Sequence, residues 1–414
     1  MSIRHRSKKT FLASFFAAVA LAATAWALVS GRASRPGGGP ASDAPVRELV
    51  PAAGLSPDTP HITPDHDVPG TSLFEGHTLG APRVIGNLTV FAVYARAQED
   101  IGDVLSLDDA LERGLAEVRE LGSEDGSTRG SGARVNTLVI ENKGTLPILV
   151  LAGTIVKGGK QDRQIGQDFV VLAKKTEPVD AFCVEHGRWN AQRDGAATAG
   201  KFSSAKVLAV GEVRGAGQYG NNQSEVWQKV SETNRKHGKS APSDSLLATI
   251  DDAEVQKRRA TLAAEVASHL RGAPQPTDVV GMAYAVSGKV RGVRTFMSHR
   301  IFRSYVEVLA NTAALEAITA SATGEADPGK VDAAAVAAFV KAVESGSRTE
   351  RDTPAANANS YYDHEVGYGS MAVLKSPKAA AAPTGTSTAG AAPGSPAAAA
   401  TAKLKAITRD YLAK

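Results

Sequence analysis

Cysteine is almost absent from this chain of 414 residues, and aromatic residues make up only 5% of it. Because Cys183 is the single cysteine, no intrachain disulfide can form, and the fold must depend on its hydrophobic core. The sequence also lacks a GxSxG elbow, an HExxH pair and a CxxC pair. These absences disfavour serine hydrolases and zinc enzymes. They do not bear on a magnesium site, because carboxylates that hold magnesium through waters leave no spacing pattern in the sequence.

A surplus of positive charge is missing from most of the chain. The net charge is +4, and the only charged residues before Ala27 are Arg4, Arg6, Lys8 and Lys9. The remaining chain is therefore neutral overall. Binding to a phosphate backbone needs an excess of Lys and Arg on one face, so the composition argues against nucleic acid as a partner.

An uncharged apolar run from Phe11 to Val29 follows these four cations. Its length is just sufficient to cross a bilayer, and Ala25-Trp26-Ala27 offers a small-residue cleavage site. Residues 1–30 are therefore predicted to be a signal peptide or a signal anchor, and we favour the anchor. The predicted location is the cell envelope, with the domain held outside the cytoplasm at the inner membrane, or secreted if the signal is cleaved.

Composition divides the rest of the chain into three parts. Residues 31–80 are rich in Pro, Gly, Ala and Asp and are predicted to form a flexible linker. Residues 81–346 carry the periodic patterns of one α+β domain, with a mainly antiparallel sheet from its N-terminal half packed against helices from its C-terminal half. Residues 347–414 are predicted to form a loosely structured Ala/Pro-rich tail, with a strand at 369–374 and a short helix at 403–414 as candidates within it.

Apolar spacing and capping residues predict the elements of the domain. Helices are expected at 107–120, 223–238, 252–270, 299–322 and 331–344. Hairpins are expected from the strand pairs 83–85 with 88–94, 134–141 with 148–153, 168–173 with 179–184, and 279–287 with 290–295.

Polar residues are densest between Gly153 and Trp189. Within this stretch, the segments GGKQDR (Gly158–Arg163) and CVEHGRW (Cys183–Trp189) flank the expected hairpin of 168–173 and 179–184. An antiparallel pairing would place both segments at the same end of the strands. We therefore expect their side chains to converge.

These residue types suit an anionic ligand with a flat ring. Glycines expose backbone N–H groups, guanidinium groups form bidentate hydrogen bonds with phosphate, and an indole can stack on the ring of the ligand. The predicted ligand-binding residues are Lys157, Gly158, Gly159, Lys160, Gln161, Arg163, Arg188 and Trp189. Glu185 and His186 are the candidates for acid–base catalysis or for recognition of ribose hydroxyls. The alternative is equally open: solvated lysines on a loop, a core tryptophan and an ordinary Glu–Arg pair.

Two other chemistries fit the same stretch poorly. A phosphate-binding P-loop requires a glycine where Thr154 stands and a Ser or Thr where Gln161 stands. Cys183, at the end of an apolar run, is more typical of a buried core residue than of a nucleophile. The polar cluster of His61, Asp65, His66 and Asp67 lacks the second ligand pair of a metal site, and no cofactor can be named.

Several strings give the chain a family resemblance. GGKQDR and CVEHGRW, together with LDDALERG, QSEVWQKV and VVGMAYAVSGKVRGVRTF, resemble the bacterial ARG- and rhodanese-phosphatase-associated protein domain of the first type, over residues 83–344. The resemblance implies association with ADP-ribosylglycohydrolase-type and NAD-linked pathways, and no established activity. The family is expected to have acidic residues after Gly153, where this chain has Thr154 and Ile155. If those acids are catalytic, this member is inactive.

The sequence supports two hypotheses. In the first, an envelope-facing domain binds or processes an ADP-ribose-like or other phosphorylated nucleotide-like small molecule. In the second, a non-catalytic interaction module is displayed on a membrane anchor for a protein partner, and its motifs are structural. Export favours the second hypothesis, because NAD and ADP-ribose pools are intracellular.

Overall fold

The computed structural model describes residues 60–62, 70–121, 136–190, 192–193, 196–198, 200–375 and 406–414. These residues lie in one compact unit, Leu49–Lys414. Of the described residues, 29% are helical and 38% lie in strands, and the large sheets are antiparallel, which confirms the α+β class.

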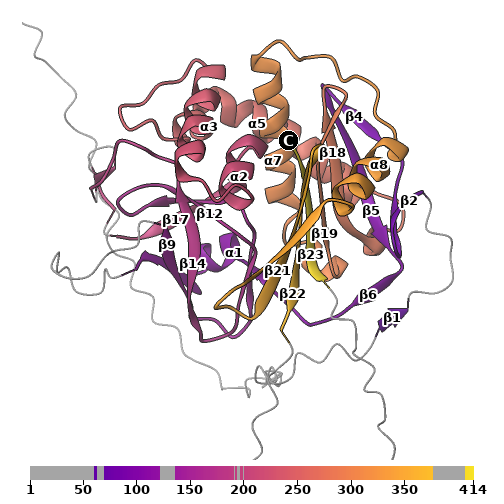
Figure 1. Cartoon of the computed structure of the whole chain (residues 1–414), viewed down its shortest axis with the longest axis horizontal. Coiled ribbons are helices and arrows are strands. Elements are labelled where there is room, and N and C mark those ends of the chain that lie inside the picture. Colours follow the sequence, from indigo (N-terminus) through magenta and orange to yellow (C-terminus); the bar gives the residue numbers. More distant parts are fainter. Residues whose placement is uncertain are drawn as a thin grey trace, which may run out of the picture. The chain divides into compact units, whose positions relative to one another are not determined.

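The largest sheet is antiparallel and has ten strands (Figure 1). Its hydrogen-bonded order is β2-β3-β5-β18-β19-β23-β22-β21-β20, and β4 pairs with β5. The strands are β2 Thr71–Phe74, β3 His77–Leu79, β4 Arg83–Ile85, β5 Leu88–Ala95, β18 Val279–Val286, β19 Lys289–Phe296, β20 Ser347–Asp352, β21 Asn357–His364, β22 Gly367–Leu374 and β23 Ala406–Ala413.

Helices cover both faces of this sheet around β5, whose residues are all buried. Val90 and Ala92 point to one face, where they join a core cluster with residues of the helices α5 (Ala253–Arg271) and α7 (Val306–Ala322). Phe91 and Val93 point to the other face and pack in a cluster that includes Val336 of helix α8 (Ala333–Glu344). Burial on both faces explains why β5 is continuously apolar rather than alternating.

A second, six-stranded sheet carries the segments singled out in the sequence. Its order is β17-β11-β12-β14-β9-β8. The strands are β8 Ala116–Glu120, β9 Thr137–Asn142, β11 Thr154–Gly158, β12 Arg163–Ile165, β14 Thr176–Cys183 and β17 Phe202–Leu208. Smaller sheets consist of β13 Phe169–Val171, β10 Ile148–Val150 and β7 Leu105–Ser106, of β1 Pro60–Ile62 with β6 Ala97–Glu99, and of β15 Gln192–Arg193 with β16 Ala196–Ala197.

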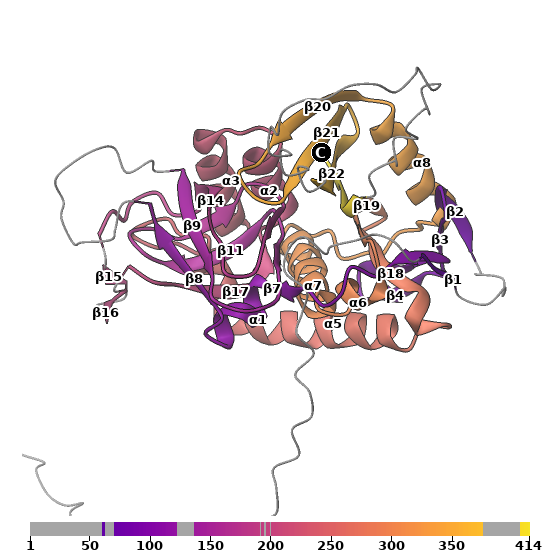
Figure 2. The same cartoon turned by 90° about the horizontal axis from the view of Figure 1, so that it is seen from below.

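The helices fill the space between and beside the sheets. They are α1 Leu107–Glu112, α2 Gly211–Gln218, α3 Gln223–Lys236, α4 Leu247–Ile250, α5 Ala253–Arg271, α6 His299–Phe302, α7 Val306–Ala322 and α8 Ala333–Glu344, with a 3-10 turn at Pro276–Asp278. Helix α7 packs against α5, against β17 of the six-stranded sheet and against β18 of the ten-stranded sheet. Figure 2 shows α5 along one side of the unit, with α7 next to it.

Capping side chains start the helices where the sequence predicts. Ser106 accepts a hydrogen bond from the Asp109 N–H, Asn222 caps α3 and Asp252 caps α5. The predicted helix 107–120 is nevertheless too long. Gly114 has φ +66°, which ends the α-helical run after fewer than two turns, and the chain continues as β8.

Two of the predicted hairpins are wrong, although their strands exist. Strand β9 pairs with β14 and β8, whereas β10 pairs with β13 and β7. Strands β13 and β14, expected to pair with each other, therefore belong to different sheets. The hairpins β4–β5 and β18–β19 are confirmed. Strand propensity is local, but pairing is decided by contacts distant in sequence.

The chain on both sides of the predicted domain also differs from expectation. Strands β2 and β3 precede residue 81, so the predicted linker 31–80 contains part of the sheet. Of the predicted loose tail, residues 347–374 contain strands β20 to β22 and residues 406–413 form a strand rather than a helix, whereas residues 376–405 lie outside the described residues. The candidate strand at 369–374 is confirmed as part of β22.

The predicted signal segment, 1–30, lies outside the described residues. So do Asp65, His66 and Asp67 of the polar cluster. Within the described part of the chain, no helix is both long and apolar enough to span a bilayer.

Candidate functional site

The segments GGKQDR and EHGRW do meet, but through a strand pair that the sequence did not indicate. Strand β12 pairs antiparallel with β14, so that Arg163 lies opposite Cys183. GGKQDR connects the end of β11 to the start of β12, and EHGRW (Glu185–Trp189, the end of CVEHGRW) follows β14, which places both at the same edge of the six-stranded sheet. The N–H of Val184 donates to the carbonyl of Asp162 and extends this pairing.

The centre of the site is a buried ion cluster of Arg188, Glu185 and Asp162. Arg188 Nε donates to both carboxylate oxygens of Glu185 at 2.9 Å, and its Nη2 lies 2.8 Å from Glu185 Oε2. Arg188 Nη2 also lies 3.5 Å from Asp162 Oδ1. The N–H of Asp162 donates to Glu185 at 3.0 Å. One guanidinium thus pairs with two buried carboxylates.

The glycine loop closes over this cluster. Arg188 Nη1 donates to the carbonyl of Gly159 at 2.8 Å, and Nη2 donates to that of Gly158 at 3.1 Å. The N–H of Gly158 donates to Asp162, and that of Gly159 to the carbonyl of Lys201. The loop N–H groups and the guanidinium are therefore occupied within the protein, and this geometry does not present them to an anion.

The other predicted cations are held by carboxylates. Lys157 Nζ lies 3.5 Å from Asp251, and Lys160 Nζ lies 3.9 Å from Glu120. Arg163 is 1% exposed and lies 3.8 Å from Glu120. Gln161 donates to the carbonyl of His186 at 3.3 Å and so ties the two segments together.

Trp189 and His186 lie outside the buried cluster. Trp189 is 51% exposed, with Lys160 Nζ 5.8 Å and the Arg163 guanidinium carbon 5.9 Å from its ring centroid. The imidazole of His186 is exposed and contacts the indole of Trp227, with 4.4 Å between ring centroids. Trp189 is thus a surface side chain between two cations rather than a core residue.

A pocket of about 530 Å³ borders the cluster. The N–H groups of His186 and Gly187 both donate to the carbonyl of Ser243, which fixes the chain before α4 against EHGRW. The pocket lies between these segments, and its lining residues are Asp162, Glu185, Gly187, Arg188, Asn190, Ala241, Pro242, Ser243, Ser245, Leu247, Ala248, Asp251 and Asp252. Its volume is in the range of small-molecule sites.

The pocket wall also contains carboxylates that the sequence pattern did not predict as site residues. Asp162 stands inside GGKQDR, where it accepts hydrogen bonds from the Gly158 N–H at 3.0 Å and from the Ser245 hydroxyl at 2.9 Å. Asp251 and Asp252 come from the junction of α4 and α5. Asp162 could have been suspected from its position beside the glycines, but the other two resemble ordinary capping residues.

Cys183 is excluded from the chemistry of this site. It is fully buried in β14, and burial raises the pKa of its thiol. A thiol that resists ionisation is a poor nucleophile, in agreement with its predicted core role.

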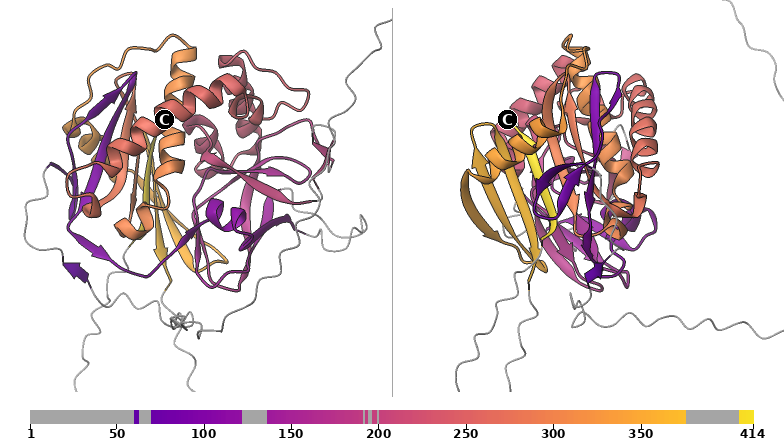
Figure 3. Two further views of the ribbon diagram at one scale, coloured as in Figure 1. Left: turned by 180° about the vertical axis from the view of Figure 1, so that it is seen from behind. Right: turned by 90° about the vertical axis from the view of Figure 1, so that its right-hand side faces the viewer.

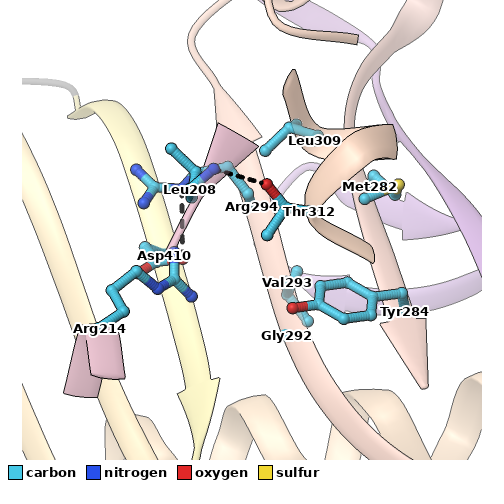
Figure 4. A pocket seen from close by; sticks show the side chains of 10 residues that line it. All are labelled: Leu208, Arg214, Met282, Tyr284, Gly292, Val293, Arg294, Leu309, Thr312 and Asp410. Atoms are coloured by element: carbon cyan, nitrogen blue, oxygen red, sulfur yellow. Dashed lines mark hydrogen bonds and ion pairs between the residues drawn. The ribbon is translucent and has the colours of Figure 1, made fainter. Parts of the chain in front are cut away.

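A second buried ion cluster joins β19 and β23 of the ten-stranded sheet to α2 and to Asp168, the residue before β13. Arg294 Nη1 donates to both oxygens of Asp168, at 3.1 and 2.9 Å. Asp410 lies 3.2 Å from Arg294 Nε and 3.3 Å from Arg214 Nη1 (Figure 4). The cavity beside these groups holds only about 10 Å³, the size of one water, so this cluster is no ligand pocket. In the sequence, Asp168 stands at the start of an apolar strand, and no local pattern indicates its buried cationic partner.

The model of the ARG and Rhodanese-Phosphatase-superfamily-associated Protein domain matches residues 76–384, most of the chain. The chain belongs to this family. The match includes both segments and the whole pocket wall of this associated-protein domain, whereas β23 lies beyond it. No curated protein and no solved structure matches the chain.

The family's expected acidic positions are occupied here by Thr154 and Ile155. Both side chains are buried in β11, and neither lines the pocket. The carboxylates at the pocket come from Asp162, Glu185 and the α4–α5 junction. Within the described residues, no group of three or more His, Cys, Asp or Glu side chains is arranged to hold a metal ion.

Proposed function

We propose that this domain, exported or membrane-anchored through its N-terminal segment, binds a nucleotide-like small molecule in the pocket beside GGKQDR and EHGRW. The observation that carries the proposal is the pocket itself. It is large enough for such a ligand, and both segments contribute to its wall.

The lining favours the ribose end of such a ligand. Asp162, Glu185, Asp251 and Asp252 place four carboxyl groups at the pocket, against the single guanidinium of Arg188. Carboxylates accept hydrogen bonds from vicinal hydroxyl groups but repel phosphate. We therefore assign the sugar, rather than a phosphate, to the pocket floor.

Phosphate groups have a separate place in this proposal. Lys157 Nζ lies 3.5 Å from the lining residue Asp251, and a third of the Lys157 side chain is exposed. A phosphate at the pocket rim would be attracted by the Lys157 ammonium group once this side chain turns from Asp251 to the ligand. Lys160 lies beside Glu120 and Trp189, neither of which lines the pocket, so it is not assigned the same role.

The test compares a variant whose pocket is filled by a larger side chain with a control variant that carries the same change on the surface. Thermal unfolding would be followed with ADP-ribose, NAD, adenosine and ribose 5-phosphate, in the natural protein, in Ala248→Leu and in Ala334→Leu. Ala248 lines the pocket, whereas Ala334 is exposed on α8. A ligand that prefers the folded state should raise the melting temperature of the natural protein and of Ala334→Leu, but not of Ala248→Leu.

Ribose recognition and phosphate recognition can be separated in the same screen. If the sugar is the main determinant of binding, adenosine should raise the melting temperature nearly as much as ADP-ribose does. The Lys157→Ala substitution should reduce the stabilisation by ADP-ribose more than the stabilisation by adenosine. No stabilisation by any of these compounds, with a well-folded protein, would contradict the proposal.

One observation favours a non-catalytic interaction module as a second function. The charged side chains Glu185, Arg188 and Asp162 satisfy one another, as a structural framework does, while Trp189 remains exposed. Exposed tryptophans beside cations are common in protein interfaces. Two results together would establish this alternative. None of the small molecules would stabilise the domain, and a protein partner would bind the natural domain but not the Trp189→Ala variant.

A further inference from the structure

The pocket has two walls that come from different parts of the fold. One wall holds Asp162, Glu185 and Arg188, which flank the paired strands β12 and β14 of the six-stranded sheet. The other wall is the chain from residue 241 to residue 252, which joins α3 to α5 through α4. Figure 3 shows these pink and salmon helices beside the purple and magenta strands of the sheet. A molecule in the pocket therefore contacts both walls.

The helical wall combines small or apolar side chains with a carboxylate. Before the two aspartates of the α4–α5 junction, its lining residues are Ala241, Pro242, Ser243, Ser245, Leu247 and Ala248. Small apolar side chains of this kind pack well against a flat ring. Asp251 follows Ala248 by three residues at the end of α4, and residues three apart on a helix are neighbours. A ring that packs on Ala248 would therefore have a carboxylate at its edge.

Carboxylates predominate among the charged side chains that line the pocket. The one cation in the lining is Arg188. Its guanidinium is shared between Glu185 and Asp162, which are 3% and 1% exposed. A phosphate placed against this wall would meet two carboxylates beside the one guanidinium and would be repelled. A positively charged group in the pocket would instead be attracted from both walls.

Asp251 is the carboxylate best placed to contact such a group. A third of its side chain is exposed, and its ion pair with Lys157, at 3.5 Å, is longer than a direct charge-assisted hydrogen bond. When Lys157 turns to a phosphate of the ligand, Asp251 can exchange the lysine for a positive charge on the same ligand. Asp252 is less available, because its carboxylate caps α5 and accepts a hydrogen bond from Lys239.

We propose that the ligand of this pocket is a nucleotide whose base carries a positive charge, such as an N-ribosyl pyridinium. This inference rests on the proposed function, because it names the ligand class of the same pocket. The ribose lies on Glu185 and Asp162, the charged ring packs on the apolar part of residues 241–248, and the Asp251 carboxylate lies at the edge of the ring. A phosphate and a cationic ring on one ligand give both members of the Lys157–Asp251 pair an opposite charge.

The experiment compares ligands that differ in the charge of the base. The first pair is nicotinamide mononucleotide, which has a cationic ring, and its reduced dihydro form, which has a neutral ring of nearly the same size. The second pair is 1-methyladenosine, which is cationic at neutral pH, and its neutral isomer N6-methyladenosine. Titration calorimetry gives the dissociation constants for the full natural chain and for its Asp251→Asn and Glu254→Gln variants, at low and at high salt.

The natural chain should bind the cationic member of each pair about tenfold more tightly than the neutral member, because one more charge-assisted contact forms. High salt should reduce this preference. Asp251→Asn should remove most of the preference and leave binding of the neutral members nearly unchanged. Glu254→Gln is the matched control, because Glu254 is exposed in the first turn of α5 and does not line the pocket. The control should keep the preference.

The outcomes that contradict the inference differ from those that contradict the proposed function. Equal affinity within each pair would overturn the inference and leave the proposed function standing, because a neutral nucleotide would still occupy the pocket. A preference of the same size in Asp251→Asn would overturn the role of Asp251. If none of the four ligands binds and adenosine does not stabilise the folded protein, the inference and the proposed function are both wrong.

Discussion

Arg188 and Lys160 belong to the same predicted site but differ in their surroundings. Arg188→Ala would leave Glu185 and Asp162 as buried carboxylates without their cation. We expect it to lower the free energy of unfolding by about 3–5 kcal/mol. Lys160 is 40% exposed and should tolerate alanine within about 0.5 kcal/mol. Urea unfolding of both variants checks this difference, and equal midpoints would show that Arg188 is dispensable for stability.

Glu316 on α7 gives the protein a pH-dependent stability. Burial raises the pKa of its carboxyl group, although the Gly211 N–H donates to it. The folded state therefore holds this proton more tightly than the unfolded state, and the stability so gained below the ordinary pKa is lost as pH rises through the raised value. Relative to the natural protein, Glu316→Gln should gain stability as pH increases across this range.

The measurement is urea unfolding of the Glu316→Gln variant and the natural protein at a series of pH values. Glu307→Gln, an exposed carboxyl change on the same helix, is the control and should show no such trend. A stability difference for Glu316→Gln that does not vary with pH would contradict the expectation.

The pairing of β11 with β17 depends on one glycine. Gly158 has φ +139°, and a Cβ there would lie 2.1 Å from the Lys201 carbonyl oxygen. Gly158→Ala should therefore cost about 3 kcal/mol or more by separating the strands next to the pocket. Gly76→Ala also has positive φ but meets no atom within 4 Å, and should cost only about 1–2 kcal/mol. Thermal unfolding compares the two, and a larger loss for Gly76→Ala would refute the steric argument.

The stability of the whole unit depends on its last strand. Ending the chain at residue 405 removes β23, which exposes two strands and leaves Arg214 and Arg294 without Asp410. We expect loss of cooperative unfolding and rapid proteolysis. Deleting residues 384–396 from the Ala/Pro-rich tract, in contrast, keeps β23 and should leave the unfolding transition unchanged. A cooperative transition in the shorter chain would show that the sheet closes without this strand.

The sequence by itself determined the features that depend on near neighbours. Capping side chains fixed the starts of α3 and α5, and turn residues fixed the hairpins β4–β5 and β18–β19. The dense segments of the candidate site were also visible, because residues of unusual composition stand close together along the chain.

Only the tertiary structure decided which strands pair and which charges meet. Asp410 reaches Arg214 and Arg294 from beyond an Ala/Pro-rich tract that suggested no core, and Arg188 is committed to Glu185 and Asp162 rather than to a ligand. Local patterns report propensity within a few residues, whereas a buried charge is stabilised by whichever partner the fold brings near. The sequence therefore located the candidate site, and long-range packing decided which partner each of its charged side chains contacts.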